Sequence, residues 1–231
     1  MKRTREMEKQ QSSSKLRFII QELSLLAVDH HHEDHDHQVV AEVDQLNIPI
    51  KPFLSLCNFL LHLLDKIGPT MAVMRQDIFR NIQRLEKMQE LNPTLYSNVV
   101  EILKIEINEG TSRKVNSCSK AFVWLTRSLD FTVNLLELIE KNIEVDMERA
   151  VEEAYETTLK PWHGWISSTA YRVAQKLVPD NKTIMDILIS EAKDEETLKD
   201  EINTFKSLLV PLLVKIHSVL KHYGLDRLKA A

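Results

Sequence analysis

Glycine is rare in this chain, and its rarity restricts the fold more than any other feature of the sequence. Only 4 glycines occur among 231 residues, whereas average usage would place roughly 16 in a chain of this length. Tight turns and short hairpins depend on glycine because it adopts positive φ without a steric penalty. The sequence therefore predicts few such turns and favours helices.

Apolar residues recur at helical spacing along nearly the whole chain, between the marks set by proline and glycine. Hydrophobic residues make up 43% of the chain, which is enough for a substantial core. No alternating apolar run, internal repeat or sustained heptad favours another architecture. We therefore predict one all-α domain over 16–231, with a kink at Pro211. The predicted helices cover residues 16–27, 52–67, 70–90, 93–108, 113–141, 144–159, 162–177, 182–192 and 196–223.

Two polar stretches depart from this helical pattern. Residues 1–15 combine charged residues with a serine run and lack aromatic anchors, which predicts a flexible arm. Residues 29–37 read DHHHEDHDH and hold five of the nine histidines together with four carboxylates. Imidazoles and carboxylates bind transition metals, so a weak metal site is one interpretation. No helix fixes an i, i+4 pair of ligands there, and we therefore predict a solvated loop and assign no metal.

The charge balance and the two cysteines exclude several classes of protein. Thirty Lys and Arg stand against 34 Asp and Glu, a formal net charge of -4, so no nucleic-acid partner is predicted. Cys57 and Cys118 lie in apolar stretches without CxxC or Cys/His spacing, which indicates two buried free thiols in a reducing compartment. The sequence shows neither a signal-peptide pattern nor an apolar run of about eighteen residues. We expect a soluble protein of the cytosol.

Polar residues placed on apolar helices are the first candidates for a functional site. None of the motifs GxSxG, HExxH, GxGxxG or GxxxxGK[ST] occurs, which disfavours the common enzyme classes. Asp77, Asn81 and Arg84 stand at i, i+4 and i+7 and so share one stripe of a helix. An acceptor, an amide and a cation in one row can bind a head group with several hydroxyls. The alternative is a solvated face with an Asp–Arg contact.

Two further segments gather aromatic and cationic residues. Lys120, Trp124 and Arg127 share a helix face, where a tryptophan ring beside cations can stack on a sugar or form a cation–π contact. In LKPWHGWISS, His163 lies between two tryptophans, of which the second is Trp165. This histidine is either a hydrogen-bonded core residue or a polar group at the mouth of an apolar pocket. Tryptophans beside it suit a membrane interface.

Three segments together resemble the glycolipid transfer protein family. They are IPIKPFLSLCNFLL at 48–61, the pair Asp77 and Asn81 at D-x-x-x-N spacing, and the stretches VWLTRSLDF and LKPWHGWI. The resemblance runs from about Leu16 to Leu220, and the WHGW element is its most specific part. It implies a two-layer sandwich of helices without disulfides, enclosing a hydrophobic pocket for the two chains of a sphingolipid while the sugar stays outside.

The resemblance also implies roles for individual residues. Asp77 matches the aspartate that bonds the ceramide amide and the sugar, and Asn81 matches the asparagine that bonds sugar hydroxyls. Trp124 matches the platform under the sugar ring, and His163 the histidine that bonds the amide carbonyl of the ceramide. Trp165 matches a tryptophan implicated in membrane docking.

A second branch of the family carries ceramide-1-phosphate, with lysine at the position of Asn81 and arginines at those of Lys120 and Trp124. Two of these three positions follow the glycolipid pattern here, and Lys120 is the exception. Arg84 falls where glycolipid binders carry a lysine, and it keeps the charge with a wider fork of donors. Lys120 is therefore a secondary head-group contact that leaves an anionic ligand open.

The sequence thus predicts a carrier rather than an enzyme. We expect a protein that moves glycosphingolipids of the glucosylceramide or galactosylceramide class between membranes, with a transient membrane contact and without cofactor or metal. Transfer of ceramide-1-phosphate, and a lipid sensor that acts through a partner, are the alternatives. A hydrolase built on His163 and Asp77 is disfavoured because no nucleophile or activated water site accompanies them.

Overall fold

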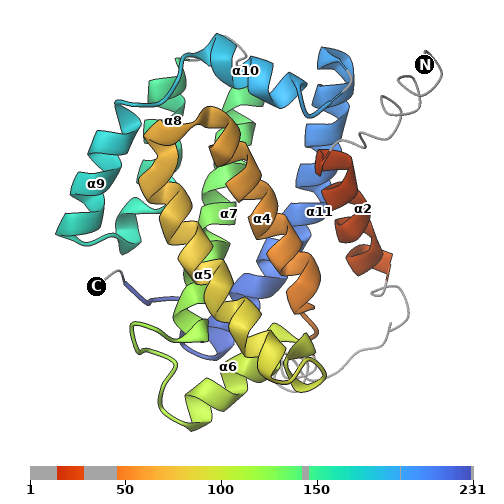
Figure 1. The fold of residues 1–231 in the computed structure, drawn as a ribbon, viewed down its shortest axis with the longest axis vertical. Helices are drawn as coiled ribbons and strands as arrows, with labels where there is room; N and C mark the ends of the chain where they lie inside the picture. Colours follow the sequence, from red (N-terminus) through yellow and green to blue (C-terminus); the bar gives the residue numbers. More distant parts are fainter. Residues whose placement is uncertain (1–14, 29–45, 142–145, 193, 230–231) are drawn as a thin grey trace, which may run out of the picture.

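The computed structural model describes residues 15–28, 46–141, 146–192 and 194–229. These residues form helices and contain no strand (Figure 1), which confirms the all-α prediction. The α-helices are α2 (Lys15–Val28), α4 (Ile50–Ile67), α5 (Ala72–Leu91), α6 (Val99–Asn108), α7 (Cys118–Lys141), α8 (Met147–Thr158), α9 (Trp165–Gln175), α10 (Asn181–Ile189) and α11 (Glu195–His222). Short 3₁₀ helices are η1 (Pro69–Met71), η2 (Leu95–Ser97) and η3 (Lys160–Trp162).

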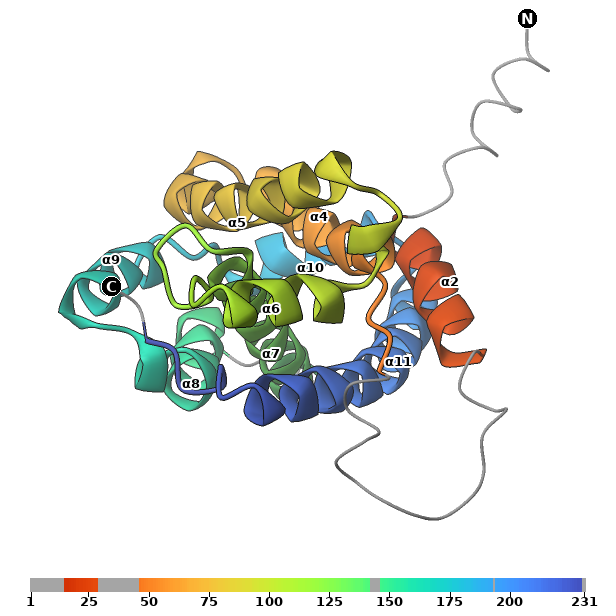
Figure 2. The ribbon, with the colours of Figure 1, turned by 90° about the horizontal axis from the view of Figure 1, so that it is seen from below.

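The helices form two layers, as predicted. Figure 2 shows α4 and α5 together on one side of the molecule and α8 and α11 on the other. The long helix α7 packs against α5 across the interface and against α8 and α11 within its own layer. Helix α2 contacts both α4 and α11 and so joins the layers at one edge, while α9 lies at the opposite edge.

Two apolar clusters hold these layers together. The larger one includes the fully buried rings of Phe53 on α4, Phe122 on α7 and Phe205 on α11. The rings of Phe53 and Phe122 lie 4.8 Å apart at their centroids, and burial of such a side chain contributes about 1.5–3 kcal/mol. The smaller cluster joins α7, α8 and α9, where the rings of Tyr155 and Tyr171 stack at 3.4 Å.

The few glycines serve where the chain leaves a helix. Gly68, Gly110 and Gly224 have φ of 108°, 66° and 62° and follow α4, α6 and α11. Side chains with a β-carbon rarely adopt positive φ, so glycine ends these helices at low cost. Asparagine and aspartate side chains cap the starts of α6, α8, α10 and α11.

Most predicted helices agree with the structure, but those predicted to start at 93, 113, 144 and 162 begin three to six residues later. The one predicted to start at 144 begins at Met147, since Asp146 supplies its cap. The helix predicted to start at 113 begins at Cys118, because residues 111–117 form turns that end where a side chain from α6 caps α7. The one predicted to start at 93 begins at Val99 after η2, since Asn98 supplies its cap. The one predicted to start at 162 begins at Trp165, because Pro161 belongs to η3 instead. Helix α11 continues through Pro211.

Several sequence predictions concern residues outside the described ranges. The predicted arm ends at Lys15, the first residue of α2, and its other residues and the histidine-rich segment 29–37 lie outside. Cys57 and Cys118 are both buried and free, as predicted, and burial raises the pKa of the Cys118 thiol to about 12. No helix in the described ranges is both long and apolar enough to span a membrane.

Candidate functional site

A polar pocket opens between α5, α7 and α9 and has a volume of about 400 Å³. It contains six residues predicted to contact a ligand: Asp77, Asn81, Arg84, Lys120, Trp124 and His163. The first three come from α5, the next two from α7, and His163 from the turn between η3 and α9. Trp165 does not line this pocket and is instead 81% exposed at the start of α9.

The row on α5 is held together by hydrogen bonds. Asn81 is only 4% exposed, and its Nδ2 donates to the backbone oxygen of Asp77 at 3.0 Å and to the Asp77 carboxylate at 3.4 Å. Arg84 Nη1 donates to Asn81 Oδ1 at 3.0 Å. Asn81 is therefore buried between Asp77 and Arg84 and bonded to both, and no Asp77–Arg84 ion pair occurs among the described residues.

Asp77 keeps acceptor capacity that faces the pocket. Its carboxylate has a single long bond, from Asn81, among the described residues, whereas an ionised carboxylate can accept about four. Water reaches this carboxylate, but the protein that surrounds the pocket raises its pKa, and the nearby Arg84 and Arg80 oppose that rise only in part. A ligand with an N–H and a hydroxyl would supply the missing donors.

Arg127 supports the pocket from behind and does not line it. Its guanidinium lies 4.9 Å from the ring centroid of Trp124 and 4.2 Å from that of Trp162. It also donates to the backbone oxygens of Leu228 at 2.6 Å and Asp226 at 3.0 Å. Burial lowers the pKa of this guanidinium to about 10. Of the two cations predicted beside Trp124, Arg127 thus fixes the indole and the C-terminal segment, and Lys120 alone faces the pocket.

His163 is oriented by its neighbours. Its Nδ1 lies 3.2 Å from the hydroxyl of Tyr155, which is also 3.3 Å from Ser168 Oγ. The imidazole lies 5.4 Å from the Trp124 ring between centroids. Burial, and to a lesser extent the charge of Arg127, lowers the pKa of His163, so the ring is neutral at neutral pH. Because Nδ1 is engaged, Nε2 is the nitrogen left for a ligand.

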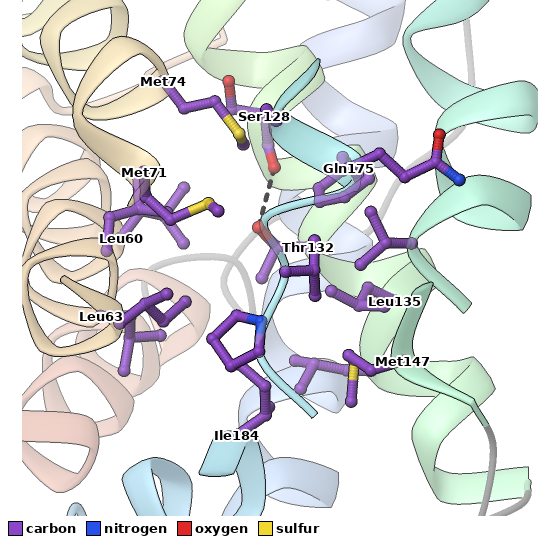
Figure 3. Close-up of a pocket in the computed structure, with 18 of the residues that line it drawn as sticks. Leu60, Leu63, Met71, Met74, Ser128, Thr132, Leu135, Met147, Gln175 and Ile184 are labelled. Atoms are coloured by element: carbon purple, nitrogen blue, oxygen red, sulfur yellow. Dashed lines mark hydrogen bonds between the residues drawn. The ribbon is translucent and has the colours of Figure 1, made fainter. Parts of the chain in front are cut away.

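An apolar cavity, drawn in Figure 3, shares part of its wall with the polar pocket. Its volume is about 180 Å³, and its walls come from α4, α5, α7, α8, α9 and α10. The few polar side chains in the wall include Ser128 and Thr132, whose hydroxyls donate to Trp124 O and Ser128 O within their own helix. Neither hydroxyl therefore has a proton left to donate to a ligand in the cavity. Six residues line both spaces: Met74, Ile78, Ser128, Leu159, Tyr171 and Ala174.

Sequence reasoning did not find several of these residues. Tyr171 lies at the junction of both spaces, where it stacks on Tyr155 and donates its hydroxyl to Val151 O at 2.8 Å. Val73 and Val115 line the polar pocket although they are 72% and 62% exposed. An apolar residue in a helix or a turn carries no signal that separates a cavity wall from an ordinary core, so these residues could only be found from the structure.

The joined spaces fit an amphiphile. One side offers a carboxylate, an amide, two cations and an indole, and the other offers almost pure hydrocarbon. A molecule with a polar head and apolar tails can satisfy both at once, since hydrogen-bonding groups and methylenes are each placed where they are favoured.

Comparison with known proteins agrees with this geometry. A family model described as "Glycolipid transfer protein (GLTP)" matches residues 48–190, more than half of the chain. Glycolipid transfer protein 3 of Arabidopsis thaliana is 52% identical over 81% of both chains, and glycolipid transfer protein 2 of the same plant is 48% identical over the full length of both.

A solved structure shares the fold at low sequence identity. It is a crystal structure of a mutant of Arabidopsis ACD11 (accelerated-cell-death 11) complexed with C12 ceramide-1-phosphate. The TM-score is 0.76 with 19% identity, and the match covers 94% of this chain and all of that one. This likeness supports the arrangement of the helices and leaves the choice of ligand open.

Proposed function

The chain belongs to the glycolipid transfer protein family, and on that premise we propose that it carries glycosphingolipids between membranes. Members of this family are lipid transfer proteins and not enzymes. The observation that carries the proposal is the junction of the polar pocket with the apolar cavity. In this proposal residues 16–231 act as one lipid-binding domain.

The polar pocket would bind the head group and the ceramide amide. The Asp77 carboxylate would accept from the amide N–H and a sugar hydroxyl. With the Tyr155 hydroxyl donating to Nδ1 of His163, the proton of the neutral ring lies on Nε2, which would donate to the amide carbonyl. Asn81 and Arg84, already aligned by their mutual bond, would bond further sugar hydroxyls. Trp124 would lie under the sugar ring, held from behind by Arg127.

The apolar cavity would receive the first part of the two hydrocarbon chains. A ceramide exposes about thirty methylenes when it leaves a bilayer, at roughly 0.8 kcal/mol for each one. A protein that buries them gives the lipid a free energy close to that in the membrane, so uptake and release are both accessible. Such transfer needs no covalent chemistry, in keeping with the polar residues present.

A neutral sugar is the head group that we favour. An indole face stacks on a sugar ring but donates no hydrogen bond to a phosphate from that face, and the relatives at 52% and 48% identity are named for glycolipids. One observation favours a second candidate, ceramide-1-phosphate. Lys120 and Arg84 both face the pocket, and neither forms an ion pair among the described residues, so an anionic head group would find charge-assisted donors.

Transfer of labelled lipids between vesicles tests the proposal. Glucosylceramide, galactosylceramide and ceramide-1-phosphate are supplied in separate donor vesicles, and arrival in acceptor vesicles is followed with time. We expect transfer of the first two. Transfer of ceramide-1-phosphate alone would assign the protein to the phosphate-binding branch of the family. Binding without transfer of any lipid would contradict a carrier and favour a lipid sensor.

Opposite effects of Trp124→Ala and Lys120→Ala would identify the head group. We expect Trp124→Ala to lower the rate of glucosylceramide transfer about fivefold to tenfold, because the stacking surface is lost. Lys120→Ala should leave that rate nearly unchanged, since its ammonium is not needed by a neutral sugar. The reverse order, measured with ceramide-1-phosphate in the same vesicles, would support the phosphate candidate instead.

We also propose that Trp165 docks the protein transiently on a membrane from the cytosol. Its indole is 81% exposed and covers no core, so its removal should not unfold the chain. Trp165→Ala should reduce adsorption to vesicles about tenfold, in a sedimentation assay, because the inserted apolar area is lost. Leu91→Ala, at a residue 78% exposed at the end of α5, is the matched control and should adsorb normally. Equal adsorption by both variants would exclude this role.

A further inference from the structure

A third space lies at the far end of α7. This distal cavity has a volume of about 460 Å³ and is formed by α7, α10 and α11. Its inner wall is apolar, and Leu198 and Ile202 of α11 stand opposite α7. The described residues that line it are Leu136, Ile139, Glu140, Met185, Glu195, Glu196, Leu198, Lys199 and Ile202. None of them lines the polar pocket.

Helix α7 passes the three spaces in order. Trp124 lines the polar pocket, and Ser128 lines both that pocket and the apolar cavity. Leu136 and Ile139 line both the apolar cavity and the distal cavity. From Ser128 to Ile139 the helix rises about 17 Å. A chain that starts at the polar pocket and follows α7 through the apolar cavity therefore arrives at the distal cavity.

The apolar cavity is too small to hold the whole of both hydrocarbon chains. At about 180 Å³ it is close to the size of an engineered cavity of about 150 Å³ that holds one benzene molecule. Two chains of a ceramide contain several times the carbon of benzene, so the lipid needs further space. The distal cavity is more than twice as large and shares two wall residues with the first.

Two side chains of α7 stand between the two cavities. Leu136 and Ile139 are neighbours on one face of α7, and both line the two cavities. Met185 of α10 lines the distal cavity and packs against both apolar clusters of the protein. A methionine side chain has three rotatable bonds and adjusts to a new neighbour more easily than a branched residue does. Met185 can therefore adjust on the distal side if a chain passes Leu136 and Ile139.

The outer edge of the distal cavity is charged. Glu195 and Glu196 begin α11, and Glu140 ends the apolar face of α7, where it pairs with Lys206. Methylenes would lose their apolar surroundings beyond this edge. The distal cavity thus has an apolar interior and a polar limit, as expected of the end of a hydrocarbon path.

We propose that the distal cavity is a subsite for the end of a very long acyl chain, which reaches it between Leu136 and Ile139 beneath Met185. This inference depends on the proposed function, since the chain must first enter by the polar pocket. It assigns selection of acyl length to residues of α11 that contact neither the head group nor the apolar cavity.

A bulky residue in the distal cavity tests the subsite. Ile202→Trp would fill it without touching the apolar cavity. Binding of glucosylceramides with octanoyl, palmitoyl and lignoceroyl chains is measured by tryptophan fluorescence and by vesicle transfer. We expect weaker binding of the lignoceroyl lipid by about tenfold, the effect of some two methylenes left unburied, and unchanged binding of the octanoyl lipid. Val214→Trp, at a residue of α11 that is 65% exposed, is the matched control.

A second measurement needs no variant. A lignoceroyl glucosylceramide with a diazirine at the chain end is bound to the wild-type protein and photolysed. Adducts on residues 195–202 support the subsite, whereas adducts confined to the wall of the apolar cavity would overturn it. Equal loss for all chain lengths in Ile202→Trp would overturn it as well. Failure of the wild-type protein to bind any of the glucosylceramides would instead contradict the proposed function.

Discussion

Replacing Asp77 with valine should lower the rate of glucosylceramide transfer by about tenfold to a hundredfold. The carboxylate is the group in the polar pocket with acceptor capacity left for the ceramide amide, and a hydrogen bond to a charged group contributes about 1.5–3 kcal/mol. The fold should not suffer, since the surroundings of Asp77 already oppose its charge. Vesicle transfer and thermal unfolding followed by circular dichroism measure the two effects.

Gln76→Val is the control for this substitution. Gln76 is the exposed neighbour of Asp77 on α5 and does not line the polar pocket. Normal transfer by both variants would show that the pocket does not hold the amide through Asp77. A fall in transfer accompanied by loss of helical signal would point to a structural role instead.

The pH dependence of binding gives an independent check on Asp77. Hydrogen bonds to the ionised carboxylate are stronger than those to its protonated form, so affinity should fall as pH drops through the raised pKa of Asp77. The loss should begin at a higher pH than for an ordinary aspartate. The charges of Arg84 and Arg80 act on Asp77 in the opposite sense, and His163 in the same pocket has a lowered pKa of its own. Asp77→Asn should remove the part of the profile that belongs to Asp77, in a fluorescence titration with glucosylceramide.

The parts of this protein that could be predicted from sequence are those set by local spacing. Helical periodicity located α4, α5 and α11 to within about two residues. The intervals between Asp77, Asn81 and Arg84 placed them on one stripe, and the structure joins them by hydrogen bonds on α5. Both results follow from the geometry of a single helix, which needs no knowledge of the rest of the chain.

The parts that could not be predicted depend on contacts between distant segments. The sequence predicts that Arg127 shares a helix face with Trp124, but it does not predict that backbone oxygens a hundred residues later hold the guanidinium behind the indole. The sequence predicts a helix over 113–117, whereas these residues form turns. The prediction fails because the cap that fixes the start of α7 comes from α6 and not from the neighbouring sequence. Each cavity is bounded by residues from several helices, so the residue spacing within one helix does not predict it.

The contact that starts α7 gives the largest expected effect on stability. Glu106 of α6 is 9% exposed, and its carboxylate accepts from Cys118 N at 2.8 Å, from Ser119 N at 2.7 Å and from Ser119 Oγ at 2.6 Å. A carboxylate at a helix N-terminus satisfies backbone donors that would otherwise be buried without partners, and it also faces the positive end of the helix dipole.

Glu106→Ala should therefore lower the free energy of unfolding by about 3 kcal/mol, or the midpoint of thermal unfolding by about 6–12 °C. Glu101→Ala is the matched control on the same helix. Glu101 pairs with Lys104 at the surface, where such a pair contributes less than about 1 kcal/mol. Urea denaturation of both variants measures the difference, and equal midpoints would show that the carboxylate does not anchor α7.

The same substitution should also reach the polar pocket. Lys120 and Trp124 lie within the first two turns of α7, directly after the residues that Glu106 holds. If the start of α7 frays, the indole loses its fixed place while Asp77 on α5 keeps its own. Glu106→Ala should then weaken glucosylceramide binding in the folded protein at low temperature and, in combination with Trp124→Ala, add little to the loss caused by Trp124→Ala alone. If the two substitutions had fully additive effects on the free energy of binding, the cap of α7 would not act on the pocket through Trp124.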